Sequence, residues 1–228
     1  MERKIEITEM KYIVKKATTV PVIDSAWDKN FWKEVTALRL NNFMGKRPEH
    51  FPEVQTKLCY DKHYLYVIFH VKDRYVRAVE RNLQGMVCKD SCVEFFFTPG
   101  TDISIGYFNF EINCGGTFLF HFQKSRGCEV RNIFPEHCSV IKVAHSLPKI
   151  VEPEITEPTT WTVEYALPFE ILPYYAPVIM PESGVIWKAN FYKCGDATSH
   201  PHWLTWSRVE HPVPNFHLPA FFGTLEFE

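Results

Sequence analysis

Glu94 is a carboxylate in a segment whose other residues predict burial. In the run KDSCVEFFF, Val93, Phe95 and Phe97 alternate as they do in a strand, and Phe96 makes the opposite face apolar as well. An ionised carboxylate in a strand covered on both sides costs several kcal/mol unless it is paired or hydrogen-bonded. Two explanations are open: a structural partner, or a polar ligand that needs a fixed acceptor at the bottom of a groove.

A second carboxylate, Glu111, lies in the run YFNFEIN. Glycosidases cleave with two carboxylates that flank the scissile bond, so Glu94 and Glu111 could act as such a pair if their strands were neighbours. No further signature supports catalysis, and no family-specific motif surrounds any cysteine. The sequence therefore predicts no catalytic residue and keeps a glycoside hydrolase as an alternative.

Metal and cofactor motifs are weak. His200 and His202 flank a proline, and no cysteine or histidine nearby completes a zinc pattern. No methionine and histidine pair matches a haem site. We expect neither haem nor a nucleotide cofactor.

Composition excludes several classes of partner. The 228 residues carry a net charge of −2, which gives no general attraction to nucleic acid or to an anionic membrane. No apolar run approaches the roughly 20 residues that span a bilayer. The aromatic content of 15% favours β structure with a thick core.

The N-terminal run MERKIEITEMKYIVKK lacks the apolar centre of a secretory signal. The seven cysteines are scattered, and none forms a C-x-x-C pair, which predicts reduced thiols. We therefore expect a cytoplasmic protein as the sequence stands, or a periplasmic or secreted one if a leader has been removed.

Strand patterns recur with turn residues between them. Residues 161–167 (WTVEYAL) alternate with a period of two, and residues 54–60 and 64–71 are close enough to form a hairpin. Residues 18–23 predict an edge strand because Pro21 would interrupt a central ladder. The remaining predicted strands are 92–97, 107–113, 117–122, 138–144, 185–192, 203–206 and 223–227.

Helical periodicity is nearly absent. Residues 24–33 predict a short helical turn with Asp24 or Ser25 as its N-cap, and residues 168–175 predict another turn. Residues 145–158 predict a long surface loop or hairpin. The sequence thus predicts an all-β protein, a two-sheet antiparallel β-sandwich, with an N-terminal extension over 1–17 and a single domain over 18–228.

Several segments follow one another in a known order. They read PVIDSAWDKNFW, YDKHYLYVIFHVKD, KDSCVEFFF, YFNFEINCGG, WTVEYALPF and WLTWSRVEHPVPNFHLPAFFGTL. This succession resembles the family 9 carbohydrate-binding modules of the wider DOMON-like β-sandwich group, over roughly residues 18–228. The resemblance implies a sandwich that binds sugars without cleaving them. Family members often accompany xylan- or cellulose-degrading enzymes, and some hold structural calcium.

The resemblance also implies a site. Trp206 matches one of two tryptophans that sandwich a terminal sugar ring, whereas Cys88 or Val87 takes the place of the other. Glu94 matches the groove glutamate, and Asn113 a polar groove position. Two residues before Asn113, where sugar binders of the family can carry a base, this chain has Glu111. Asp73 matches an acidic position near a calcium site.

The residues themselves can supply what sugar recognition needs, an aromatic plane and a few fixed polar groups. Trp203 and Trp206 lie three apart and would face opposite sides of a strand, so at most one lines a given groove, and the resemblance favours Trp206. Asn190 and Lys193 follow on a nearby strand, where Lys193 could bind a sugar hydroxyl or balance a buried carboxylate.

Phe216 and His217 could form a second wall in place of the lost tryptophan. Together these residues predict non-catalytic binding of a mono- or oligosaccharide, linked to polysaccharide or oligosaccharide catabolism. The alternatives are a sugar-processing hydrolase and a structural or interaction module that has lost its groove.

Overall fold

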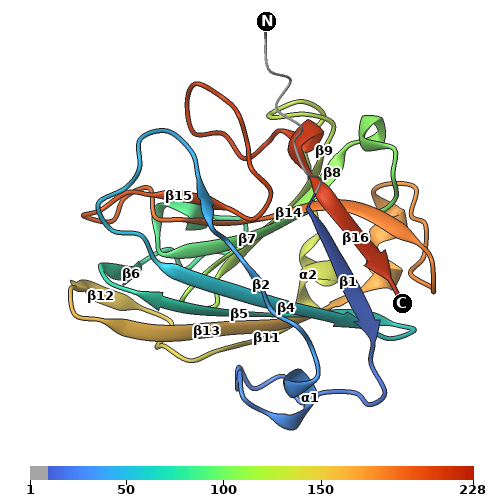
Figure 1. The fold of residues 1–228 in the computed structure, drawn as a ribbon, viewed down its shortest axis with the longest axis horizontal. Coiled ribbons are helices and arrows are strands. Elements are labelled where there is room, and N and C mark those ends of the chain that lie inside the picture. The colour runs from blue at the N-terminus through green and yellow to red at the C-terminus, as the bar shows by residue number, and fades with distance from the viewer. Residues whose placement is uncertain (1–9) are drawn as a thin grey trace, which may run out of the picture.

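Two antiparallel sheets face each other across a shared core in the computed structural model, which describes residues 10–228 (Figure 1). Residues 1–9 of the predicted extension lie outside the described residues. Sheet A contains, in spatial order, β10 (Arg131–Asn132), β9 (Phe118–Gln123), β8 (Tyr107–Asn113), β7 (Cys92–Thr98), β14 (Ile186–Cys194) and β16 (Gly223–Phe227). In addition, β15 (Trp203–Thr205) pairs with β14, and β3 (Asn42–Phe43) pairs with β15. Sheet B contains β4 (Glu53–Tyr60), β5 (Tyr64–Asp73), β13 (Thr159–Pro168) and β11 (Lys142–His145), with β2 (Leu38–Arg39) beside β4. The predicted all-β sandwich is confirmed.

Strand β1 (Lys11–Lys16) joins the two sheets. It pairs in parallel with β16 along Lys11–Val14 and then with β4 through Lys15 and Lys16, so that hydrogen bonding continues through a 14-stranded sheet. The domain therefore begins earlier than the predicted boundary at residue 18. Tyr12 and Val14 alternate with exposed residues and are buried, a period-two signal that the charged surroundings obscured.

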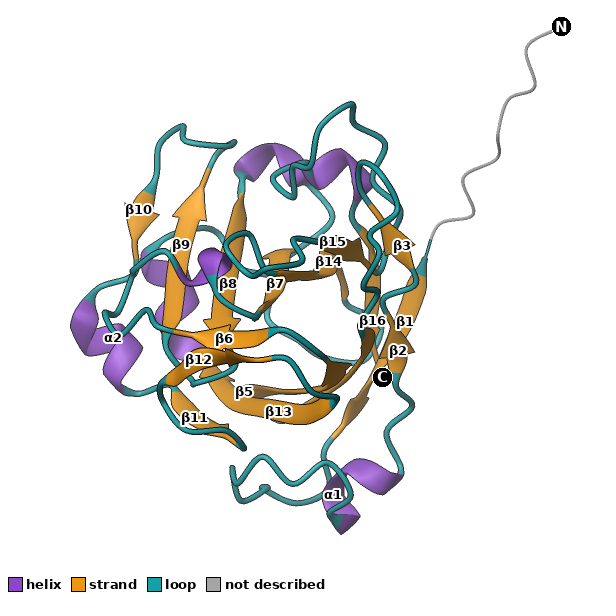
Figure 2. Cartoon of the chain, turned by 90° about the vertical axis from the view of Figure 1, so that its left-hand side faces the viewer, coloured by secondary structure: helices purple, strands orange, loops and turns teal. Residues whose placement is uncertain are grey.

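The short elements lie at the edges of the sandwich (Figure 2). A separate two-stranded sheet pairs β6 (Val76–Ala78) with β12 (Val151–Ile155), which gives the predicted loop over 145–158 a strand of its own. The helices are α1 (Asn30–Lys33), α2 (Pro135–Ser139) and the 3-10 turns η1 (Val87–Lys89), η2 (Ile103–Ile105), η3 (Phe169–Tyr174) and η4 (Pro219–Phe221). Within residues 10–228, none of these helices has the length and apolar character needed to cross a bilayer.

Two local predictions in the N-terminal part need correction. Residues 18–23 form no strand, and Val20 and Val22 are 71% and 74% exposed, because no neighbouring strand pairs with this segment. The helical turn is shorter than predicted: α1 starts after Lys29, and Asp24 instead accepts a hydrogen bond from the Ala26 N–H. The hairpin of β4 and β5 and the turn η3 follow the predictions closely.

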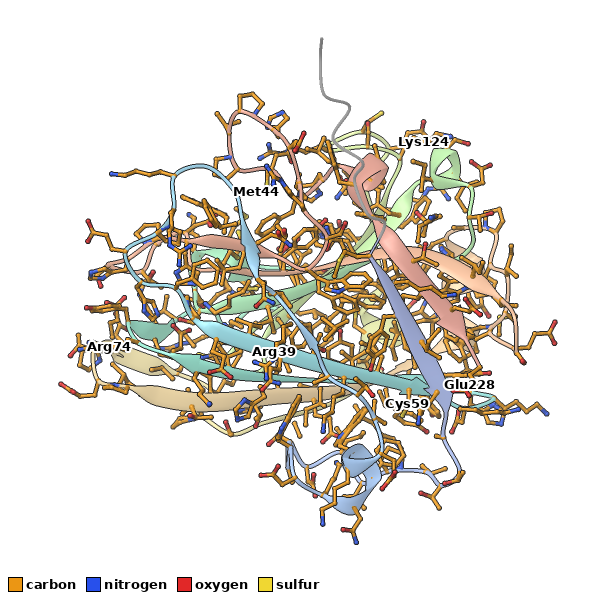
Figure 3. The ribbon with its side chains drawn as sticks, viewed as in Figure 1. Arg39, Met44, Cys59, Arg74, Lys124 and Glu228 are labelled. Carbon is orange, nitrogen blue, oxygen red and sulfur yellow. The ribbon has the colours of Figure 1, made fainter. Side chains whose placement is uncertain are left out.

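Side-chain alternation divides sheet A into two faces. Phe95, Phe97 and Phe191 point toward sheet B and stack on one another in the central core. Side chains fill the space between the two sheets (Figure 3). Phe96 and Tyr192 point the other way and belong to a second cluster, on the outer face of sheet A. Glu94 shares the parity of Phe96 and therefore also faces outward.

A buried carboxylate attaches the N-terminal segment to sheet B. Glu164 in β13 is fully buried and accepts hydrogen bonds from Trp32 Nε1 at 2.9 Å, from the Ser25 N–H at 2.8 Å and from the Asp24 N–H at 3.0 Å. The Lys29 ammonium lies 2.6 Å from the same carboxylate. These donors compensate the cost of burying the charge, and they position α1 against the sheet.

We expect Glu164→Ala to lower the free energy of unfolding by about 3–5 kcal/mol, because it leaves buried donors and the Lys29 charge without their acceptor. Urea unfolding followed by tryptophan fluorescence measures the change. Glu157→Ala removes an exposed carboxylate of the loop before β13 and serves as the control, with an expected change within about 0.5 kcal/mol. Equal stability of the two variants would contradict this role of Glu164.

Candidate functional site

The loop 207–218 arches over the outer face of sheet A (Figure 1). A pocket opens beneath this loop, on the outer face of the sheet. Its volume is about 420 Å³, within the range of small-molecule sites. Strands β7, β8, β9 and β14 supply the floor, and β15 and the arching loop supply the walls. The pocket is thus built on rigid strands and closed by a loop.

Two carboxylates form the centre of the floor. Glu94 and Glu111 are paired directly across β7 and β8, so both side chains project from the same face, with 3% and 7% exposure. Burial raises the pKa of Glu94 well above its ordinary value, and the neighbouring charge of Glu111 raises it further. Burial raises the pKa of Glu111 to about 7. Near neutral pH the pair therefore retains a proton, and it can donate as well as accept a hydrogen bond.

A chain of hydrogen bonds orients the polar groups beside these carboxylates. Asn109 Nδ2 donates to Glu111 Oε1 at 2.9 Å, and Gln123 Nε2 donates to Asn109 Oδ1 at 2.9 Å. Gln123 Nε2 also lies 3.2 Å from His217 Nδ1, and the Tyr107 hydroxyl lies 3.0 Å from the same nitrogen. Because an amide nitrogen can only donate, His217 Nδ1 accepts and its proton resides on Nε2. The pocket thus holds its polar groups in fixed orientations.

Histidines in the pocket are neutral near pH 7. Burial lowers the pKa of His217 to about 4, and burial also lowers the pKa of His121. His121 lines the pocket from β9, and its Nε2 is buried without a hydrogen-bond partner in the described part of the chain. An unpaired buried nitrogen beside a cavity is costly, and a ligand hydroxyl would satisfy it.

Aromatic rings line the walls. Trp203 lies in β15 directly opposite Cys194 and so shares the outer face, where its Nε1 donates to Asp196 Oδ1 at 2.8 Å. Phe216 lies in the arching loop and stacks on Tyr192 with ring centroids 4.2 Å apart. Both rings are fixed by their neighbours. Phe216 and His217, which the sequence analysis suggested as a second wall of the groove, both line the pocket.

The position of the tryptophan platform needs correction. Trp206 is only 2% exposed, belongs to the central core and packs against Phe191. A Cβ atom built on Gly223 would lie 2.7 Å from its ring, so the ring is enclosed on that side as well. Trp203 lines the pocket instead, because the two tryptophans project from opposite faces of β15 and its continuation.

Asn113 and Asn190 are structural rather than pocket residues. Asn113 is fully buried, donates to Asp90 Oδ2 at 2.9 Å and accepts from the Thr117 N–H at the turn after β8. Asn190 is fully buried and binds both the N–H and the carbonyl of Ser207. Neither side chain lines the pocket, and the polar atoms of both are occupied by neighbouring protein groups.

Lys193 points away from the pocket, into the space between the sheets. It is fully buried, and its ammonium lies 3.2 Å from Asp73 Oδ2 and 2.7 Å from His202 Nε2. His50 Nε2 lies 2.6 Å from Asp73 Oδ1, and Trp161 Nε1 donates to Oδ2 at 3.3 Å. Although burial raises the pKa of Asp73, the charge of Lys193 and the hydrogen bond from His50 together hold it below its ordinary value.

The surroundings of Asp73 do not suit a calcium ion. Calcium requires six to eight oxygen ligands. Here the carboxylate meets nitrogen donors, and the Lys193 ammonium already supplies the positive charge. We derive no role for a metal at Asp73.

We expect Lys193→Met to lower the free energy of unfolding at pH 7 by about 3–5 kcal/mol, because it leaves the Asp73 charge buried without its cation. The double variant Asp73→Asn with Lys193→Met should recover most of this loss, since it buries no charge. Thermal and urea unfolding measure both effects. Additive losses in the double variant would show that the two groups do not depend on each other.

The buried His202 predicts a pH dependence of stability. Burial and the Lys193 charge lower its pKa to about 3, whereas in the unfolded chain a histidine titrates near 6.5. The unfolded state therefore gains a proton as pH falls below about 6.5, and the folded state does not until about 3, so stability is lost across this window. The loss reaches on the order of 3 kcal/mol by pH 4.

We expect the stability difference between wild type and His202→Gln to shift in favour of the variant as pH falls from 7 to 4, because glutamine cannot take up the proton but can still accept from Lys193. Urea unfolding at several pH values measures the free energy of unfolding of both proteins. Groups that titrate alike in the two proteins cancel when one free energy is subtracted from the other. Parallel curves for the two proteins would contradict the assignment of His202 as a buried neutral histidine.

The sequence interpretation found only part of the pocket. It placed Glu94, Glu111, Phe216 and His217 among functional residues, and all four line the pocket. It missed Asn109, His121, Gln123, Cys194 and Trp203, which also line it. Polar residues at alternate positions in YFNFEINC and FLFHFQ indicate that each segment has one polar strand face. Only the pairing of β8 with β9 shows that these two polar faces lie side by side.

Family membership follows from comparison with known proteins. The model of carbohydrate-binding family 9 matches residues 26–227. The chain belongs to this family. The resemblance seen in the sequence is thereby confirmed, while curated protein sequences contain no match to the chain.

Solved structures agree with this assignment. A candidate carbohydrate-binding protein from Bacteroides uniformis superimposes with a TM-score of 0.84 at 29% identity, over 97% of this chain and 100% of that one. A family 9 carbohydrate-binding module from Caldicellulosiruptor kristjanssonii, in complex with cellotriose, is similar with a TM-score of 0.66 at 16% identity, over 96% of this chain and 94% of that one. The module in complex with glucose gives the same TM-score and identity, over 96% of each chain. The likeness to these two complexes establishes the shared fold.

Proposed function

We propose that this family 9 protein binds a mono- or oligosaccharide without cleaving it, in the pocket on the outer face of sheet A. Family membership supports carbohydrate binding in general. The observation that carries the specific site is one pocket that combines the Trp203 and Phe216 rings with the oriented polar groups of β7, β8 and β9. Aromatic faces and fixed hydrogen-bonding groups are what a pyranose requires.

In the proposed complex, the sugar ring lies against the indole of Trp203. The hydrogen bond from Trp203 Nε1 to Asp196 fixes this ring, so that little side-chain freedom is lost on binding. Phe216 forms the facing part of the wall, held by its stacking on Tyr192. In the proposed complex, Trp203 and Phe216 replace the tryptophan pair to which the resemblance assigned Trp206.

Hydroxyl groups of the sugar meet the floor. The Glu94 and Glu111 pair can donate and accept at neutral pH, and His121 Nε2 lacks a partner until a ligand supplies one. Asn109 and Gln123 are held in place by their mutual hydrogen bond. Polar groups that are fixed before binding give selectivity, since a ligand that cannot match them leaves them unpaired.

One observation favours a hydrolase as the second candidate. Glu94 and Glu111 lie directly opposite each other on antiparallel strands, a pairing that places Cβ atoms about 4.5–5.5 Å apart, and retaining glycosidases use two neighbouring carboxyls. However, both carboxyls project side by side from one floor rather than from opposite sides of a bound ring. We therefore assign them to binding and propose that the protein does not turn over glycosides.

The test is calorimetric titration of the full chain with glucose and with cellotriose. We expect Trp203→Ala to weaken binding by about 1–2 kcal/mol, or roughly tenfold, because it removes the stacking plane. Trp27→Ala is the matched control: this tryptophan packs on His70 and Lys57 near α1, so its loss should leave affinity unchanged. The melting temperature of each variant confirms that it is folded.

The outcomes separate the candidate functions. Equal weakening by the two tryptophan variants would remove Trp203 from the site. No binding of any mono- or oligosaccharide by the folded wild type would favour an interaction module with a lost groove. Release of product from chromogenic glycosides, abolished by Glu94→Gln, would favour the hydrolase.

A further inference from the structure

Two thiols and a carboxylate meet at the base of the pocket. Cys92 in β7 lies directly opposite Cys194 in β14, and Glu94 follows two residues later on the same face of β7. The Sγ atoms of Cys92 and Cys194 and one carboxylate oxygen of Glu94 all lie within 4.8 Å of one another. The period-two alternation of both strands brings these groups together, because each belongs to the outward face of sheet A.

The Glu94 carboxylate is held within this cluster by a weak hydrogen bond. Cys194 Sγ donates to Glu94 Oε1 at 3.1 Å, and a thiol is a poor donor. Each thiol also lies near a backbone carbonyl, Cys92 Sγ 3.6 Å from Val93 O and Cys194 Sγ 3.5 Å from Cys88 O. The side chains of Cys92, Cys194 and Glu94 are at most 3% exposed. Binding of a divalent cation would release the two thiol protons to solvent and join both thiolates and the Glu94 carboxylate in one set of ligands.

We propose that Cys92, Glu94 and Cys194 form a binding site for a thiophilic divalent cation such as Zn²⁺. A tetrahedral zinc ion with bonds of about 2.3 Å to sulfur and 2.0–2.2 Å to oxygen holds its ligand atoms about 3.6–3.8 Å apart. Separations of up to 4.8 Å need to contract by about 1 Å, whereas the 3.1 Å between Cys194 Sγ and Glu94 Oε1 needs to widen by about 0.5 Å. Rotation of side chains on fixed strands can supply such a change.

The donor set defines the class of metal. Two sulfurs with one carboxylate favour zinc, cadmium or cobalt over calcium or magnesium, which prefer oxygen ligands. The site differs in this respect from Asp73, which lies on the inner side of the sandwich among nitrogen donors.

The fourth coordination position faces the pocket. Glu94 and Cys194 line the pocket, whereas Cys92 lies behind them. A cation held by these three groups therefore keeps one position open toward the cavity, as in zinc sites with three protein ligands and an exchangeable fourth. The inference does not rest on sugar binding, since the three ligands are present whether or not a saccharide occupies the pocket.

The experiment uses the full chain, reduced and stripped of metal, in a Cys128→Ser background that removes the one exposed cysteine. Titration with Co²⁺ reports directly on sulfur ligation, because thiolate-bound tetrahedral cobalt absorbs in the near ultraviolet and the visible. We expect these bands to saturate at one equivalent and to disappear on addition of Zn²⁺. Absence of the bands in the folded protein would overturn the proposal.

Variants locate the site. Cys92→Ser and Cys194→Ser should each weaken cobalt binding by roughly 100-fold or more, whereas Cys59→Ala, which alters a buried thiol of sheet B, should leave it unchanged. If a serine variant does not fold, Glu94→Gln decides, with an expected loss of at least roughly tenfold. Unchanged binding in Glu94→Gln, or in both folded serine variants, would overturn the assignment.

Discussion

The buried ion pair between Asp73 and Lys193 fixes how the two sheets of this protein relate to each other. Asp73 ends β5 in sheet B and Lys193 lies near the end of β14 in sheet A, so their contact bridges the sandwich. Because Lys193 must point inward to reach Asp73, Tyr192 and Cys194 must point outward. A shift of β14 by one residue would bury a thiol between the sheets and leave a charge in the pocket. The inner pairing thus specifies the outer site.

The outer face of β14 and its neighbours then provides a surface on which polar groups can be arranged. Strands hold Glu94, Glu111 and Asn109 at fixed spacings, and loop 207–218 covers them with Phe216 and His217. Residues on strands are held more firmly than residues on loops, which suits groups that must be oriented before a ligand arrives. The apolar cluster around Phe96 and Tyr192 supports this floor from the side.

The sequence predicted the class of fold and most strands, because period-two alternation and turn residues are local signals. It could not predict β1 as the joint between sheets, since that pairing depends on residues more than 200 positions apart. The choice between Trp203 and Trp206 also required register: both are aromatic and three apart, and only the pairing of Trp203 with Cys194 reveals which one faces the pocket. Likewise, the sequence left open whether Lys193 binds a sugar hydroxyl or balances a buried carboxylate. Strand parity places Lys193 on the face opposite Glu94, where it pairs with the buried Asp73. The motif match to the family indicated which region holds the site without fixing which side chains face the cavity.

The joint formed by β1 has a mechanical consequence. Strands β1 and β16 run parallel, one near the start of the described chain and the other at its end, and they lie side by side in both views (Figures 1 and 2). A pulling force applied between the start of β1 and the end of β16 acts along both strands and loads their hydrogen bonds together in shear, rather than opening them one after another. The chain is thus joined at its ends by a clamp that resists extension, and tension on the molecule must break this clamp before it can disturb the pocket.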